Sequence, residues 1–516
     1  MLAVPVNHLH SMARVLLRRS RLAFCLVAAT TVAISLWVHA KAGFTFPNPW
    51  NDESWMLWGA ISFMENNTPF SEYLNFERPV FAFPSFAVAM GMVFKVLGFS
   101  FALARWISWA FTMGAYLCVL RMVRRLDYPL IAAASASLFF LGASTVVAGN
   151  MVRPEALVLF LGAGSFALLT GERPWKALAI SSCCGIFHTA GLIFFLGIVA
   201  TAAALSLRNR RCPSRPSRSD VWIAGAALAI LSAHAFVIAS HWQFYLMDIR
   251  ATVQVDPPGG AFSRIFASAM TPWYSAAAIL GLICLWMKPD RIPWIAFGCV
   301  CLLIPSIRLQ MWYDVYRQMG FMMLTVSLPM VAGDLAAFLA RRFFPSARSI
   351  WLVARTAAFL VALALMLRLC RQHDWITGPN NYPQKLQWGW GMRFDDRPYI
   401  MASDIDAIAK ALQPYASSNK TIRLFSMPEA DALFFWDRLP DNVVPYQAVW
   451  SQQKPDLFLF RGSSHYPDWW RKQYVEKHAL KYGIPWDHPF LVRNGTELWV
   501  LHDPLKPVPA LTSDSP

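Results

Sequence analysis

The chain has 516 residues, of which 56% are hydrophobic and only 15% are charged, and it carries 23 tryptophans and 37 phenylalanines. A soluble enzyme cannot keep so much apolar surface from water, so the composition excludes an ordinary soluble globular protein and favours a membrane protein. The formal net charge of +16 does not indicate nucleic acid as a partner, because the basic residues cluster in short loops between apolar runs, as the positive-inside rule expects.

Apolar runs of about 20 residues, enough to cross a bilayer as a helix, begin at residue 22 and recur as far as residue 369. The first run is too long for the apolar part of a signal peptide, so we predict an uncleaved helix at 22–42. With the arginine clusters placed in the cytoplasm, the pattern predicts about eleven membrane-spanning helices. Those with the clearest limits are expected at 102–121, 129–147, 221–242, 293–306 and 349–369, and two short helices are expected within 177–207, around a polar break at His188 and Thr189.

The first external segment, 44–101, combines acidic and aromatic residues and then contains an apolar stretch at 80–97. A crossing at 80–97 would place Arg121, Arg124 and Arg125 outside, against the positive-inside rule. We therefore predict that 53–65 and 81–97 form two amphipathic helices that lie along the membrane surface.

The pattern divides the chain into three parts. Residues 1–21 are expected to be a cytoplasmic N-terminus, 22–370 a transmembrane domain, and 371–516 a soluble domain on the non-cytoplasmic side. In the last part a helical pattern at 403–412 is followed by short strand-like runs at 421–425, 457–460 and 498–501, which predicts a small α/β domain. The fold class is therefore an α-helical polytopic membrane protein with a C-terminal α/β domain.

Acidic residues concentrate on the predicted outer rim, where carboxylates at membrane depth are costly and usually functional. Asp52 and Glu53 follow the first span, Glu77 precedes the second surface helix, and Glu155 lies where the fourth span begins. Each one alone is consistent with a solvated charge at a helix end. Together they suggest a general base for an attacking hydroxyl, with a neighbouring carboxylate that holds a cation or a second hydroxyl.

Three motifs resemble those of the GT-C membrane glycosyltransferases, in particular the protein O-mannosyltransferase-like group that includes the lipid A aminoarabinose transferases. The resemblance covers roughly residues 20–340 and is strongest in the first 170. The motifs are Asn51-Asp52-Glu53-Ser54-Trp55, Phe76-Glu77-Arg78-Pro79 and Arg153-Pro154-Glu155-Ala156-Leu157.

The resemblance implies transfer of a sugar, with inversion, from a polyprenyl-phosphate-linked donor to an acceptor at the outer membrane surface. It implies that Asp52 is the base that activates the acceptor hydroxyl and that Glu53 supports it. Glu77 matches an acidic residue that takes part in metal or acceptor binding. Glu155 matches a second catalytic acidic residue that is usually Asp in this group, and the Glu is one methylene longer.

The donor phosphate needs a cation, and two arginines are candidates. Arg317 follows Tyr316 at the outer mouth of the tenth span and resembles an Arg-Tyr element of the family, with the order reversed. A guanidinium there would bind phosphate bidentately, whereas the alternative is an arginine that snorkels to the interface. Arg153 is the second candidate. His188 falls where relatives carry a Thr-Lys-Gly turn, so it would replace that cation or bind a metal, unless it is a structural histidine bonded to a backbone carbonyl.

The resulting hypothesis is an inverting glycosyltransferase, for which a divalent metal ion is the only cofactor to consider. The expected partners are a polyprenyl-phosphate-linked sugar, membrane lipid, and a glycolipid, polysaccharide or protein acceptor. A transporter or flippase of a lipid-linked solute and a non-catalytic family member are the alternatives. Acidic residues gathered on one rim and the lack of visible paired halves favour the enzyme over the transporter. The expected location is a bacterial inner membrane, with the C-terminal domain in the periplasm or outside, and the endoplasmic reticulum is the alternative.

Overall fold

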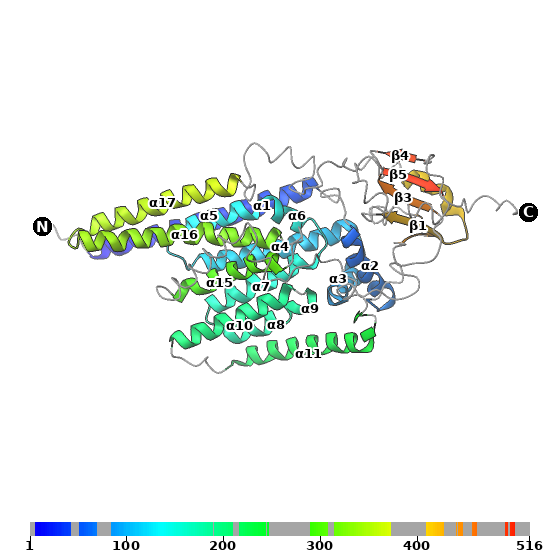
Figure 1. Cartoon of the computed structure of the whole chain (residues 1–516), viewed down its shortest axis with the longest axis horizontal. Coiled ribbons are helices and arrows are strands. Elements are labelled where there is room, and N and C mark those ends of the chain that lie inside the picture. Colours follow the sequence, from blue (N-terminus) through cyan, green and yellow to red (C-terminus); the bar gives the residue numbers. More distant parts are fainter. Residues whose placement is uncertain are drawn as a thin grey trace, which may run out of the picture.

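The structure is a computed structural model, and its described part is mostly helical (Figure 1). It describes residues 6–42, 51–69, 84–188, 190–209, 216–243, 245–246, 289–307, 314–372, 409–427, 440, 442–446, 457–461, 491–493 and 496–500.

Six described helices contain stretches that are long and apolar enough to cross a membrane. These are α1 (Val6–Ala42), α4 (Phe101–Val123), α10 (Ala190–Asn209), α11 (Arg218–Ser240), α16 (Asp314–Phe343) and α17 (Arg348–Gln372). Four shorter apolar helices accompany them, namely α3 (Pro84–Leu97), α5 (Pro129–Phe140), α7 (Pro154–Thr170) and α15 (Ile292–Ile307). The chain is therefore a multi-pass membrane protein, and the number of eleven spans stays a prediction because the expected eighth span falls outside the described residues.

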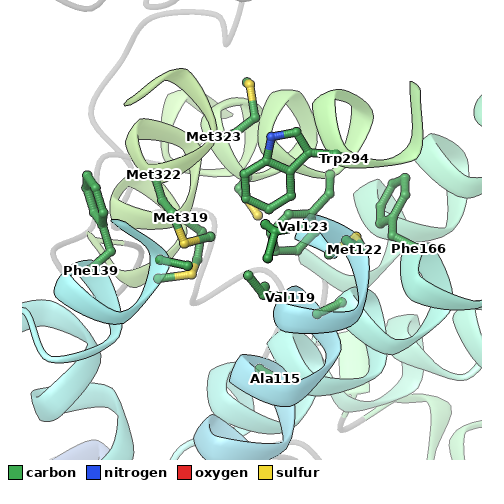
Figure 2. Packing of buried hydrophobic residues seen from close by; sticks show 14 of the residues in the cluster. Ala115, Val119, Met122, Val123, Phe139, Phe166, Trp294, Met319, Met322 and Met323 are labelled. Atoms are coloured by element: carbon green, nitrogen blue, oxygen red, sulfur yellow. The ribbon is translucent and has the colours of Figure 1, made fainter. Parts of the chain in front are cut away.

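The main core fills the space between α4, α5, α7, α10, α15 and α16. Trp294 of α15, which is 1% exposed, belongs to this core together with Met319, Met322 and Met323 of α16 (Figure 2). The indole Nε1 of Trp294 donates to the Ser327 hydroxyl at 3.0 Å, so the one polar atom of this large side chain has a partner inside the core.

The two predicted surface helices are present as α2 (Asn51–Asn66) and α3. They pack against each other and against the first turns of α4 through a separate cluster that includes Trp58, Phe86, Phe94 and Phe101. With 16 and 14 residues, α2 and α3 are about 24 and 21 Å long, shorter than the ~30 Å hydrocarbon core of a bilayer. Their length agrees with helices that do not cross, and their orientation to the membrane stays a prediction.

One predicted span is broken. The sequence predicts a continuous helix at 129–147, whereas the structure has α5 and a separate α6 (Ala143–Gly149). Gln318 of α16 bonds to both sides of the break: its Nε2 donates to the Phe139 carbonyl at 2.8 Å, and its Oε1 accepts from the Thr145 backbone N–H at 3.0 Å. A side chain from a distant helix thus satisfies backbone groups that the interruption would leave without partners.

The predicted break at His188 is confirmed. Helix α8 (Pro174–Ser182) leads into the single turn α9 (Cys184–Phe187), and α10 begins at Ala190.

Four charged residues form a network at the end of the bundle whose loops are predicted to be cytoplasmic. The Nη2 of Arg291 donates to Asp127 and, at 2.9 Å, to Asp334. The Nη2 of Arg355 lies 3.2 Å from the Asp127 carboxylate and 2.9 Å from that of Asp334. Burial opposes the charge of Arg291, but the hydrogen bond to Asp127 and the charges of both aspartates outweigh it and raise the pKa of Arg291. The network ties η1 (Pro289–Arg291), α16 and α17 to the loop after α4.

The described strands near the C-terminus form a five-stranded mixed sheet in the order β2-β1-β3-β5-β4. Strand β1 (Ile422–Met427) pairs in parallel with β2 (Val443–Tyr446) and β3 (Leu457–Arg461), while β5 (Thr496–Val500) is antiparallel to β3 and to β4 (Leu491–Arg493). Strands β1, β3 and β5 overlap the three predicted strand-like runs. That residues 371–516 form one α/β domain outside the membrane stays a prediction.

Candidate active site

Glu53 lies at the start of α2 and is completely buried in an ion pair with Arg105 of α4. Arg105 donates from Nη2 to Glu53 Oε2 at 2.9 Å and from Nε to Oε1 at 3.3 Å, and its guanidinium lies over the Phe101 ring. The backbone N–H of Val152 also donates to Glu53 Oε1, at 2.8 Å. Both carboxylate oxygens are therefore engaged, and Glu53 joins α2, α4 and the loop before α7.

A second buried ion pair follows directly in that loop. Arg153 donates from Nη2 to Glu155 Oε1 at 2.7 Å and from Nε to Oε2 at 3.1 Å, and Glu155 is 3% exposed. Pro154 starts α7, and the extended backbone of Arg153 (φ −142°) directs the chain into the helix. Glu155 is thereby placed in the first turn, where the helix dipole favours a negative charge.

His188 and Tyr316 bring two further helices to Glu155. The Nε2 of His188 lies 3.9 Å from Glu155 Oε1, and the Tyr316 hydroxyl donates to the Glu155 backbone carbonyl at 3.1 Å. His188 Nδ1 accepts from the backbone N–H of Ala190 at 3.1 Å, so its proton is on Nε2, the nitrogen nearer to Glu155. A backbone N–H at the start of α10 thus holds the His188 ring.

The structure thus brings together four of the predicted site residues, Glu53, Arg153, Glu155 and His188, from segments far apart in the sequence. We call these four, with Arg105 and Tyr316, the rim cluster. Val152, which donates to Glu53, is adjacent to Arg153, which binds Glu155. The two ion pairs of the rim cluster are therefore linked through neighbouring residues of one loop.

The other predicted residues lie beside the rim cluster or outside the described part. Asp52 precedes Glu53 in the first turn of α2, and nothing is described of its side chain. Arg317 follows Tyr316 on α16 and is half-buried. Glu77 lies outside the described residues.

Arg105 and Tyr316 are cluster members that sequence reasoning did not assign. Arg105 had a signal, since it is the one charge within an otherwise apolar span at 101–120, and such a charge normally has a buried partner. Tyr316 belongs to the motif around Arg317, but its bond to a backbone carbonyl 161 residues away leaves no mark in local spacing.

The rim cluster does not fit a divalent metal ion. Among the described residues, no three His, Cys, Asp or Glu side chains lie close enough together to hold one. Both oxygens of Glu155 also accept from the cationic Arg153, which leaves a poor set of ligands for a second cation. A metal that uses Glu77 stays a prediction.

No protein-family model matches the chain, and no curated protein matches its sequence. Among solved structures, the chain is similar to the archaeal oligosaccharyltransferase AglB from Archaeoglobus fulgidus, solved in complex with an inhibitory peptide and a dolichol-phosphate. The identity is 10% and the TM-score is 0.41, over 84% of this chain and 69% of the archaeal one. A likeness at this level assigns no activity, so the function is argued from the rim cluster.

Proposed function

We propose that the protein is a membrane glycosyltransferase that moves a sugar from a polyprenyl-phosphate-linked donor to an acceptor hydroxyl or phosphate at the outer face of the membrane. The observation that carries the proposal is the convergence of Glu53, Arg153, Glu155 and His188 in one buried cluster. Motifs in segments far apart in the sequence contain these residues, and solvated charges at unrelated helix ends would not meet in one buried cluster.

We assign the acidic residues different roles. The carboxylates of Glu53 and Glu155 are each held by an arginine, so we assign them to positioning. Asp52, next to Glu53 in the first turn of α2, is then the base. In the reaction, the Asp52 carboxylate takes the proton of the acceptor hydroxyl, and the acceptor oxygen attacks the anomeric carbon from the side opposite the phosphate. The bond from that carbon to the phosphate oxygen breaks, the lipid phosphate leaves, and the anomeric configuration inverts.

The leaving phosphate is assigned to Arg317. The outer end of α16 is fixed on both sides of this residue, by the bond from Tyr316 to the Glu155 carbonyl and by the bonds of Gln318 to the break between α5 and α6. A guanidinium on a fixed helix end can bind phosphate through two parallel hydrogen bonds and stabilise its charge as the sugar departs. Arg153, whose Nε and Nη2 already donate to Glu155, is the second candidate for this role.

The test is transfer of labelled sugar from a panel of polyprenyl-phosphate donors, in membranes that carry the wild type or Asp52→Asn. We expect transfer by the wild type and a loss of about 100-fold or more in the variant, since the base is removed. Glu65→Gln, an exposed acidic residue at the other end of α2, is the matched control and should transfer normally. Undiminished transfer by Asp52→Asn would remove Asp52 from the mechanism, and no transfer by any protein would favour the transporter and non-catalytic readings.

A further inference from the structure

The outer end of α1 contacts the loop that carries the rim cluster. The His39 ring nitrogen Nδ1 is hydrogen-bonded to Oδ1 of Asn150, and the two residues are only 3% and 1% exposed. The His39 ring packs edge-on against Trp106, with 4.3 Å between ring centroids, and stacks on Trp109 with 6.0 Å between centroids and 29° between the ring planes. A histidine is therefore held in one orientation by aromatic rings, with its polar edge turned to Asn150.

The contact has the properties of a directed hydrogen bond rather than of apolar packing. An amide oxygen only accepts, so Nδ1 of His39 carries the hydrogen and donates it. Asn150 and His39 also line a small cavity, with room for about one water molecule, together with the hydroxyl side chains of Ser35 and Thr112. Burying two polar side chains and a polar cavity inside a membrane protein costs free energy, and a pair of apolar side chains would fill the same space at a lower cost.

The loop beyond Asn150 leads in three residues to both ion pairs. The backbone N–H of Val152 donates to Glu53, and the next residue, Arg153, binds Glu155. The loop is short and tight, since the Arg153 N–H bonds back to the Met151 carbonyl at 3.0 Å. A shift of Asn150 is therefore passed to Val152 and Arg153 with little backbone between to absorb it.

We propose that His39 is a positioning residue: its hydrogen bond to Asn150 fixes the loop 150–153 and, through that loop, the places of Glu53 and Arg153 in the rim cluster. The effect on turnover rests on the proposed function, whereas the effect on the loop does not. Misplacing catalytic groups by about 1 Å can slow a reaction by about 100-fold even when the changed residue does not touch the substrate.

Two substitutions at residue 39 separate the hydrogen bond from the packing. His39→Phe keeps a ring against Trp106 and Trp109 and removes the donor, whereas His39→Asn places an amide N–H where Nδ1 of the imidazole lies. Asn150→Ser breaks the same bond from the other side, because the serine hydroxyl is too short to reach His39. His241→Phe removes a histidine from the end of α11 and serves as the control.

The measurements are hydrogen exchange at the Val152 amide and the steady-state constants of sugar transfer. We expect His39→Phe and Asn150→Ser to speed the exchange of Val152 by about tenfold. Both should lower kcat by about 10- to 100-fold with little change in KM for the donor. His39→Asn should restore both quantities, and His241→Phe should leave them unchanged.

Two results would overturn the proposal: exchange at Val152 that is the same in wild type, His39→Phe and Asn150→Ser, or a His39→Asn protein that behaves like His39→Phe. If His39→Phe does not fold, Asn150→Ser decides the first point alone. If the wild type transfers no sugar, the proposed function fails while the exchange measurement still decides whether His39 holds the loop.

Discussion

Glu53 and Arg105 show how a charge can be kept inside an apolar helix bundle. Both are almost fully buried, and Glu53 also accepts the N–H of Val152, so each charge has directed partners in a region with little water. Transfer of two such charges from water is expensive, and the pair is stable only while both members are present. The pair therefore makes the fold sensitive to a change at either residue.

Arg105→Met should lower the free energy of unfolding by about 3–5 kcal/mol, because it leaves the buried Glu53 carboxylate without the guanidinium that balances its charge. Thermal unfolding in a fixed detergent measures the change. The double variant Glu53→Leu/Arg105→Met removes both charges and should recover part of the loss. A double variant less stable than Arg105→Met alone would contradict this account.

At the residue scale, the sequence singles out residues that meet in the fold, but not the partners that hold them. Glu53, Arg153, Glu155 and His188 were identified from motifs, and they do meet. That Arg105 pairs with Glu53 follows from how α2 packs on α4, which no local pattern encodes. The same holds for His39, whose partner Asn150 is 111 residues away.

At the scale of elements, the turn between α9 and α10 depends on the absence of a side chain at Gly191. A Cβ at this position would overlap the backbone carbonyl of Cys184, a group that cannot rotate aside. The turn is what places His188 beside Glu155. A glycine at position 191 is thus needed both for the turn and for the position of His188 in the rim cluster.

Gly191→Ala should destabilise the protein by about 2–3 kcal/mol and reduce transfer, because the backbone must move to admit the methyl group. Gly225→Ala on α11 is the control, since a Cβ there meets nothing within 4 Å; it should not destabilise the protein, and the higher helix propensity of alanine should stabilise it by up to about 1 kcal/mol. Thermal unfolding compares the two, and equal effects would show that the turn is not constrained as described.

The network of Asp127, Arg291, Asp334 and Arg355 differs from the rim cluster in its exposure to solvent. The side chain of Asp127 is 32% exposed and that of Arg355 27%, so water and salt screen their interactions. Asp127→Asn should therefore cost only about 1 kcal/mol and less at high salt, whereas the loss in Arg105→Met should change little with salt. Unfolding in low and high salt measures both, and a salt-independent loss in Asp127→Asn would contradict the distinction.

The ends of helices can be predicted from the sequence where a local signal marks them. Proline and arginine mark the start of α7, and a polar break separates α9 from α10. The break between α5 and α6 was missed because the apolar pattern continues through it. The groups that accommodate the break belong to Gln318, which is 173 residues beyond Thr145.

At the scale of the whole molecule, the rim cluster and the charged network lie on segments that the positive-inside rule assigns to opposite faces of the membrane. The rim cluster joins α2, the loop before α7, the start of α10 and the start of α16, which are all predicted to be outside. The network of Asp127, Arg291, Asp334 and Arg355 joins segments that are all predicted to be inside. The contacts within the rim cluster and within the charged network therefore group the helix ends in the same way as the positive-inside rule does.

This arrangement predicts which cysteines an impermeant thiol reagent can reach in intact cells. After replacement of the nine native cysteines, Asn66→Cys, at the exposed end of α2, should react. Ser346→Cys, exposed between α16 and α17, should react only once the membrane is permeabilised. The reverse pattern would invert the topology and place the rim cluster in the cytoplasm.

The central claim is that the rim cluster is where a polyprenyl-phosphate-linked sugar reacts. The most direct measurement is photo-crosslinking of the protein with a donor analogue that carries a diazirine on its sugar, followed by identification of the labelled peptides. Labels on the first turn of α2 and on residues 150–155, suppressed by excess natural donor, are the predicted result. Labels confined to the segments around Asp127 and Arg291, or labels that the natural donor does not suppress, would contradict the claim.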